Sequence, residues 1–110
     1  MGFSARFTDP EPGRTQVDAL TGPVVLEFGT GWCSFCRAAQ PLLAASFADH
    51  PGVCHLKVED GSGRRLGRSF GVKLWPTLVF LRDGGEVTRL VRPDNVAALA
   101  HALAAIDPPA

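Results

Sequence analysis

The stretch Trp32-Cys33-Ser34-Phe35-Cys36 places two cysteines three positions apart at the expected start of a helix. Side chains at this spacing share one helix face, so the two thiols can close a disulfide with little movement of the backbone. Unpaired backbone N–H groups and the helix dipole favour negative charge at a helix N-terminus, so Cys33 should ionise more readily than a free cysteine. We therefore predict Cys33 as the nucleophile of a redox pair and Cys36, one turn deeper, as the resolving thiol.

The length and composition predict one domain over residues 1–110. Of the 110 residues 45% are hydrophobic, enough to bury roughly two-thirds of the unfolded surface without a structural metal or disulfide. Eleven basic and eleven acidic residues balance, so the charge favours neither nucleic acid nor an anionic membrane as a partner. The sequence has no secretory signal pattern and nothing near the ~18 consecutive apolar residues of a membrane span. We expect a cytoplasmic monomer, in which a CxxC pair favours redox chemistry over a structural disulfide framework.

The first half of the chain alternates between expected strands and helices. We expect an edge strand over residues 3–7, a short helix ending near Leu20, and a buried strand over 24–28. The cysteine helix should follow over 33–48, then a second strand over 53–59 and a short basic helix over 64–70. This alternation implies a parallel crossover between the two buried strands. The thiols would then lie just past the carboxyl end of a strand, where open α/β sheets tend to carry their sites.

The second half predicts a hairpin and a last helix. Runs at 77–81 and 86–91 flank Asp83-Gly84-Gly85, a strong turn signal between antiparallel strands. Apolar residues between 96 and 106 repeat at helical spacing, and this helix should begin near Asp94. The whole order is β-α-β-α-β-α-β-β-α, a central mixed sheet flanked by helices.

This order, with the CxxC motif opening the second helix, resembles the thioredoxin family over nearly the whole chain. Three motifs carry the resemblance: Trp-Cys-x-x-Cys at 32–36, a proline five residues later at Pro41, and Trp75-Pro76-Thr77 just before the hairpin. The resemblance implies a thioredoxin fold, thiol-disulfide exchange with protein disulfides and no bound cofactor or metal. It also implies that a flavoprotein thioredoxin reductase or another dithiol reduces the oxidised pair again.

By the same resemblance, the peptide bond before Pro76 should be cis, and the backbone of Trp75 should pair with an extended segment of the substrate. The groove beside the thiols would be shallow and apolar, suited to peptides rather than metabolites. Its substrate-binding residues would be Trp32, Phe35, Trp75, Pro76, Thr77 and Arg92.

Glu27 stands in the buried strand where thioredoxins carry an aspartate. Burying a charge in an apolar strand is costly, so this carboxyl should hold a proton more readily than an exposed one and could accept the proton of a buried thiol. We interpret Glu27 as the acid/base for Cys36, directly or through a water molecule. His55 stands where the family has a lysine near this acid, and its titration could change how Glu27 ionises.

Three departures from the family pattern bear on specificity. Ser34-Phe35 replaces the Gly-Pro of thioredoxins, and Phe35 can neither donate a hydrogen bond nor carry charge, so we expect a reductant or mild exchanger rather than a strong oxidant. Trp75 replaces the usual aliphatic residue before the cis-proline, and Arg92 stands in a loop where thioredoxins have glycine. The range of partners should therefore differ from that of a general thioredoxin.

Two alternatives stay open beside the disulfide reductase. The CxxC motif could be half of a zinc site completed by Cys54 and His55, but neighbouring residues of a strand point to opposite faces and could not both reach one tetrahedral ion. Cys54 is more simply a buried apolar residue. The chain could also be a redox-sensing interaction module of thioredoxin fold with little catalytic turnover. The two cysteines together with Glu27 favour the enzyme.

Overall fold

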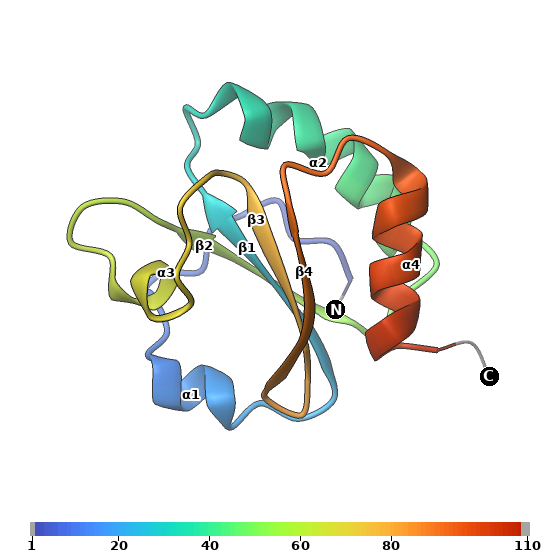
Figure 1. Ribbon diagram of the computed structural model, residues 1–110, viewed down its shortest axis with the longest axis horizontal. Coiled ribbons are helices and arrows are strands. Elements are labelled where there is room, and N and C mark those ends of the chain that lie inside the picture. Colours follow the sequence, from blue (N-terminus) through green and yellow to red (C-terminus); the bar gives the residue numbers. More distant parts are fainter. Residues whose placement is uncertain (1, 109–110) are drawn as a thin grey trace.

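The computed structural model describes residues 2–108, which form a mixed sheet flanked by helices (Figure 1). The strands are β1 (Pro23–Gly29), β2 (Cys54–Glu59), β3 (Thr77–Arg82) and β4 (Gly85–Val91), in the spatial order β2-β1-β3-β4. β1 pairs with β2 in parallel and with β3 antiparallel, and β3 pairs antiparallel with β4. The parallel crossover and the hairpin predicted from the sequence are both confirmed.

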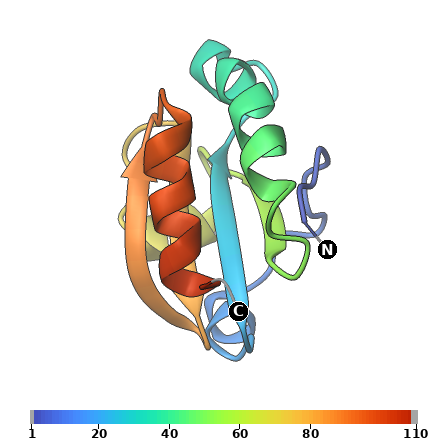
Figure 2. The same cartoon turned by 90° about the vertical axis from the view of Figure 1, so that its right-hand side faces the viewer.

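The helices are α1 (Arg14–Asp18), α2 (Ser34–Phe47), α3 (Arg65–Ser69) and α4 (Val96–Ile106). α2 and α4 lie against one face of the sheet, as Figure 2 shows, and α1 and α3 pack against the other. None of the helices within residues 2–108 has the length and apolar character needed to cross a membrane.

Alternation along β1 divides the core into two clusters. Val25 packs with apolar residues of α2 and α4, whereas Val24, Leu26 and Phe28 pack with those of α1 and α3. Successive side chains of a strand point to opposite faces, so Glu27 falls on the α2/α4 face beside Val25. A strand buried on both faces has thus placed a carboxylate inside one of the two clusters.

The edge strand predicted over residues 3–7 is wrong as a regular strand. The N-terminal segment makes only isolated parallel bridges to β2, between Gly2 and Cys54 and between Phe7 and Lys57. In between, the backbone N–H of Ser4 donates to the ring of His55 rather than to a strand carbonyl. Because this backbone donor bonds to a side chain, it does not extend the sheet, and β2 remains the edge strand on this side.

Candidate active site

Cys33 is the N-cap residue of α2, and its sulfur accepts a hydrogen bond from the backbone N–H of Cys36 at 3.2 Å. An N-cap acceptor satisfies one of the unpaired donors of the first turn, at the end of the helix where negative charge is favoured. Both cysteines are free thiols and are buried, with exposed fractions of 7% and 2%. The two thiols therefore lie together at the helix start, as the spacing predicted.

Cys36 is held in its protonated form by its surroundings. Burial is the main cause, followed by the hydrogen bond with Cys33, and together with smaller effects they raise the pKa of Cys36 from its ordinary value to about 12. The thiol packs against the end of β1, where a Cβ on Gly29 would lie only 2.5 Å from the Cys36 sulfur. Glycine at this position makes room for the resolving thiol, which needs a base before it can attack.

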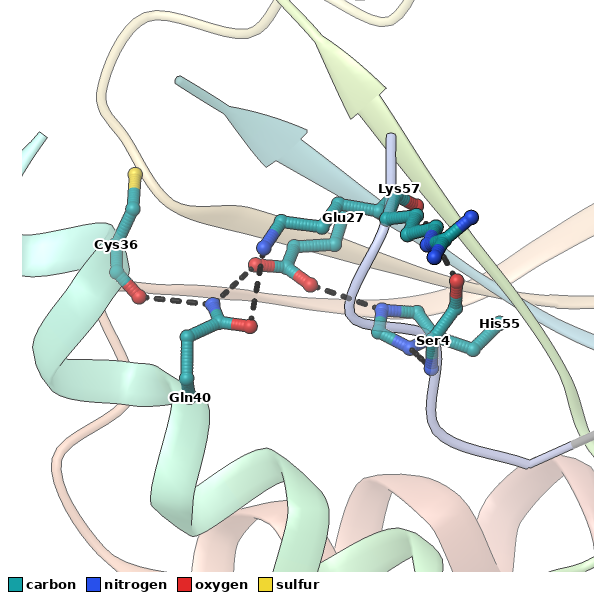
Figure 3. A network of polar contacts seen from close by, with 7 residues as sticks. Ser4, Glu27, Cys36, Gln40, His55 and Lys57 are labelled. Atoms are coloured by element: carbon teal, nitrogen blue, oxygen red, sulfur yellow. Dashed lines mark hydrogen bonds and ion pairs between the residues drawn. The ribbon is translucent and has the colours of Figure 1, made fainter. Parts of the chain in front are cut away.

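Glu27 supplies a carboxylate from the neighbouring strand. It is 1% exposed, and each of its oxygens accepts one hydrogen bond (Figure 3). Oε1 lies 2.9 Å from Nε2 of His55, and Oε2 accepts from the amide Nε2 of Gln40 at 2.8 Å. A buried carboxylate with both oxygens hydrogen-bonded avoids most of the cost of its burial.

Gln40 connects this carboxylate to the cysteine helix. The same amide nitrogen that reaches Glu27 also donates to the backbone carbonyl of Cys36 at 2.8 Å, one turn earlier in α2. Its oxygen accepts from Nζ of Lys57 at 3.1 Å. Lys57 therefore bonds to Gln40, which in turn bonds to Glu27, and the whole set ties β1 and β2 to the turn of α2 that carries the resolving cysteine (Figure 3).

The peptide bond between Trp75 and Pro76 is cis, which confirms the geometry that the sequence resemblance implied. Pro76 directly precedes β3, in which Thr77 is paired with Phe28 near the end of β1. Thr77 itself is 1% exposed, and its hydroxyl donates to the carbonyl of Leu74 at 2.6 Å. Its side chain therefore holds the turn before β3 and does not lie on the exposed rim.

Aromatic side chains and Arg92 form the rim. Trp32 and Phe35 are 73% and 55% exposed, and Trp32 meets the half-buried Trp75 edge to face with ring centroids 5.6 Å apart. The Arg92 guanidinium lies 4.0 Å from the centre of the Phe35 ring, and its Nε donates to the carbonyl of Trp75 at 2.8 Å. The structure thus brings the four predicted rim residues together beside the CxxC motif.

The rim borders a groove and is anchored from below. Trp75 donates its indole N–H to Asp60 at 2.8 Å, which fixes the orientation of the ring. A groove of about 380 Å³ runs along α2 beside the rim. It is lined by Phe35, Ala38, Ala39, Leu42, Arg92, Pro93 and Asp94. Its mainly apolar lining suits peptide side chains better than a charged metabolite.

A family model described as thioredoxin matches residues 8–105. The chain belongs to the thioredoxin family. The structure of thioredoxin 2 from Pseudomonas aeruginosa PAO1 in its reduced form is 58% identical, with a TM-score of 0.84 over 94% of this chain and 96% of that one. Desulfothioredoxin from Desulfovibrio vulgaris Hildenborough is 27% identical, with a TM-score of 0.76 over 96% and 98% of the two chains. The thioredoxin of Mycolicibacterium smegmatis is 32% identical over 92 residues, covering 81% of this chain and 82% of that protein.

Membership of the thioredoxin family gives this chain thiol-disulfide oxidoreductase chemistry in general. The position of His55 beside Glu27 agrees with its placement by sequence, since both lie on the α2/α4 face. Half-buried Cys54 packs on the opposite face. In the described part of the chain, no group of three or more His, Cys, Asp or Glu side chains could hold a metal ion.

Sequence reasoning missed Gln40 and Lys57 as members of this thioredoxin site. Two signals were available, because Gln40 follows Cys36 by four residues on the same helix face and Lys57 follows His55 by two residues on the same strand face. It also missed Asp60, whose contact with Trp75 crosses between a loop and the turn before β3.

Proposed function

We propose that this chain reduces disulfide bonds in proteins by dithiol-disulfide exchange through Cys33 and Cys36. The observation that carries the proposal is the contrast between two free thiols at the start of α2. The sulfur of Cys33 caps the helix, whereas burial raises the pKa of Cys36 to about 12. One thiol is placed to attack, and the other is kept protonated until the first step is complete.

The proposed reaction has two steps, and neither needs a bound cofactor. The Cys33 thiolate attacks one sulfur of the substrate disulfide, forming a mixed disulfide and releasing the other substrate sulfur as a thiolate that takes a proton from solvent. Cys36 then gives its proton to Glu27, directly or through a water molecule, and attacks the sulfur of Cys33. The second substrate sulfur leaves as a thiolate and takes up the proton that Glu27 accepted, directly or by exchange with solvent, so two electrons pass to the substrate and a Cys33–Cys36 disulfide remains.

The proposed substrate is an extended protein segment lying across the rim. Trp32, Phe35 and Trp75 offer exposed or half-exposed aromatic surface beside the thiols, and the backbone of Trp75 next to Pro76 would pair with the segment. Arg92 would contact it from the loop after β4. Thr77 would contribute only through its backbone, because its side chain is buried.

The oxidised pair must be reduced again for turnover. We propose a flavoprotein thioredoxin reductase or another dithiol as the partner, in a reducing compartment such as the cytoplasm. Both partners would meet the same rim, since both must reach Cys33.

Trapping of the mixed disulfide tests the mechanism. Cys36→Ser should leave the first step intact and remove the second, so a covalent adduct with an oxidised protein substrate should accumulate through Cys33. Cys33→Ser should form no adduct, and Cys54→Ser is the matched control that should turn over like the unmodified protein. Absence of any adduct through Cys33 would contradict the proposal.

One contact favours the alternative of a redox-sensing interaction module. The Trp75 carbonyl that a substrate backbone would use already accepts from Arg92 at 2.8 Å, so productive pairing has a competitor. Insulin reduction separates the two functions, first with dithiothreitol and then with NADPH and a thioredoxin reductase. Acceleration in either assay supports the reductase, and no acceleration in both supports the module.

A further inference from the structure

His55 is enclosed between the sheet, α2 and the N-terminal segment. Its side chain has an exposed fraction of 0%. The ring stacks on Phe47 with centroids 4.7 Å apart and an interplanar angle of 18°, and Phe3 lies 5.5 Å away on a tilt of 36°. Its two nitrogens bond to different partners, Nδ1 to the backbone of Ser4 at 2.8 Å and Nε2 to Glu27 at 2.9 Å (Figure 3).

The contact with Ser4 decides which nitrogen carries the proton. A backbone N–H can only donate, so Nδ1 must offer its lone pair, and the ring proton must be on Nε2. Nε2–H then donates to Oε1 of Glu27. If Nδ1 were protonated as well, its N–H would face the N–H of Ser4 with the two nitrogens 2.8 Å apart. The neighbouring rings of Phe3 and Phe47 offer no hydrogen bond in compensation. The ring is therefore neutral and fixed as the Nε2–H tautomer.

We propose that His55, locked in this tautomer by the backbone of Ser4, is a positioning residue that orients the Glu27 carboxylate to accept the proton of Cys36. This inference rests on the proposed exchange mechanism. His55 fixes Oε1 on the β2 side, and Gln40 fixes Oε2 on the side of α2 that carries Cys36. The N-terminal segment thereby becomes part of the proton-transfer apparatus although none of its residues contacts a thiol.

A neutral donor suits this task better than a cation in the same place. A cation in direct contact would stabilise the carboxylate more strongly and make it a weaker base. The charged and titratable groups facing Glu27 are His55 and, through Gln40, Lys57 from β2, with Cys36 from α2. From β3 the residue opposite Glu27 is the apolar Leu78. The Lys57 ammonium thus donates to Gln40, whereas the imidazole of His55 bonds directly to the carboxylate and orients it.

The tautomer can be read without any variant. In ¹⁵N-labelled reduced protein at neutral pH, the His55 ring should show a bare Nδ1 and a protonated Nε2. The exposed His101 serves as an internal reference. A protonated Nδ1 would overturn the lock. Ser4→Pro, which removes the N–H, should abolish this signature, and Ser4→Ala, which keeps it, should not.

The positioning role needs a kinetic readout. In single-turnover resolution of the mixed disulfide, His55→Leu should move the acid limb of the rate profile upward by about one pH unit, with a rate loss of about tenfold on that limb. The initial attack by Cys33 should keep its rate. His55→Gln, which retains a neutral donor, should recover part of the loss. His50→Gln is the matched control, since His50 also bonds a carboxylate, that of Asp107 at 2.8 Å, at the far end of α2.

The outcomes separate this inference from the proposed function. If the unmodified protein reduces disulfides while His55→Leu keeps its acid limb, only the positioning role is overturned. If the unmodified protein forms and resolves no mixed disulfide, the exchange mechanism fails, and this role fails with it. If His55→Leu does not fold, the nitrogen spectra of the unmodified protein and of the two Ser4 variants still decide whether the lock exists.

Discussion

The two faces of the sheet bury similar apolar side chains but differ in what lies among them. The face under α1 and α3 packs Leu26 and Phe28 against Val17, Leu66 and Phe70. The face under α2 and α4 packs Val25 and Phe80 against Leu43, Phe47 and the residues of α4. Only this second face, among the described residues, also buries a carboxylate and an imidazole, at Glu27 and His55.

The difference shows that one face of the sheet contributes mainly to stability, whereas the other also carries the groups proposed for the reaction. The buried cluster on the α1/α3 face is apolar and contributes through hydrophobic burial, which is roughly proportional to area. On the α2/α4 face, Glu27 and His55 add a hydrogen-bonded network that ends at the helix turn carrying Cys36. Burying such a network costs desolvation, and removing one partner leaves a buried polar group unsatisfied, so its loss should lower stability as well as reaction rate.

The largest expected effect is a loss of stability that is similar for both faces of the sheet. Phe28→Ala and Phe80→Ala remove fully buried rings from opposite faces, and each should lower the free energy of unfolding by about 3–5 kcal/mol through lost burial and a residual cavity. Urea denaturation measures both. If one variant lost more than twice as much unfolding free energy as the other, the apolar parts of the two faces would not be equivalent.

The next effect, a slower second step of the reaction, should follow only from a change on the α2/α4 face. Glu27→Gln keeps the shape and a hydrogen-bond acceptor but removes the base, so resolution of the mixed disulfide should slow by about 10²-fold, within the range for general base catalysis. Stopped-flow measurement of the second step gives the rate, and the rate of the first step serves as its control. A change of less than twofold in the second step would remove Glu27 from the mechanism.

A smaller loss should follow from crowding the resolving thiol. Gly29→Ala would place a Cβ 2.5 Å from the Cys36 sulfur, and the required shift should cost about 1–3 kcal/mol of unfolding free energy. Gly52→Ala is the control, because its added Cβ meets nothing within 4 Å and should change stability by about 0.5 kcal/mol or less. Equal stability of the two variants would mean that the thiol does not pack against β1 in solution.

The smallest effect concerns the thiols themselves. Because burial raises the pKa of Cys36 to about 12, its thiolate fraction should rise about tenfold per pH unit between pH 7 and 9 and stay small throughout. Iodoacetamide should therefore label Cys33 at least about tenfold faster than Cys36 in the reduced protein. Mass spectrometry of the labelled peptides measures both, with Cys54 on the opposite face as an internal reference. Equal labelling of Cys33 and Cys36 would contradict the contrast between them.

The parts of this arrangement that follow from local chemistry could be predicted from the sequence. CxxC spacing located the start of α2, the Asp83-Gly84-Gly85 turn located the hairpin, and a carboxylate in an apolar run marked Glu27 as buried. Each depends on residues close together in the chain, where periodicity and turn preferences are strong.

The parts that depend on side chains meeting across elements could not be predicted. Gln40 reaches Glu27 only because α2 crosses above β1, and Ser4 reaches His55 only because the N-terminal segment lies beside β2. The same limit applies to Thr77, which the resemblance put among the substrate-binding residues, since nothing in the sequence shows that its hydroxyl donates to the carbonyl of Leu74. The periodicity of the sequence predicts which face of a helix or strand a side chain lies on, but not which side chain of another element it contacts.

The reduction potential of the Cys33–Cys36 pair tests the proposed function most directly. The protein is equilibrated with reduced and oxidised glutathione at defined ratios, and the fraction of disulfide is measured after acid quenching. A reductant of protein disulfides should give a value below about −230 mV. A value above about −180 mV would make the pair an oxidant or isomerase and would contradict the direction of electron transfer proposed here.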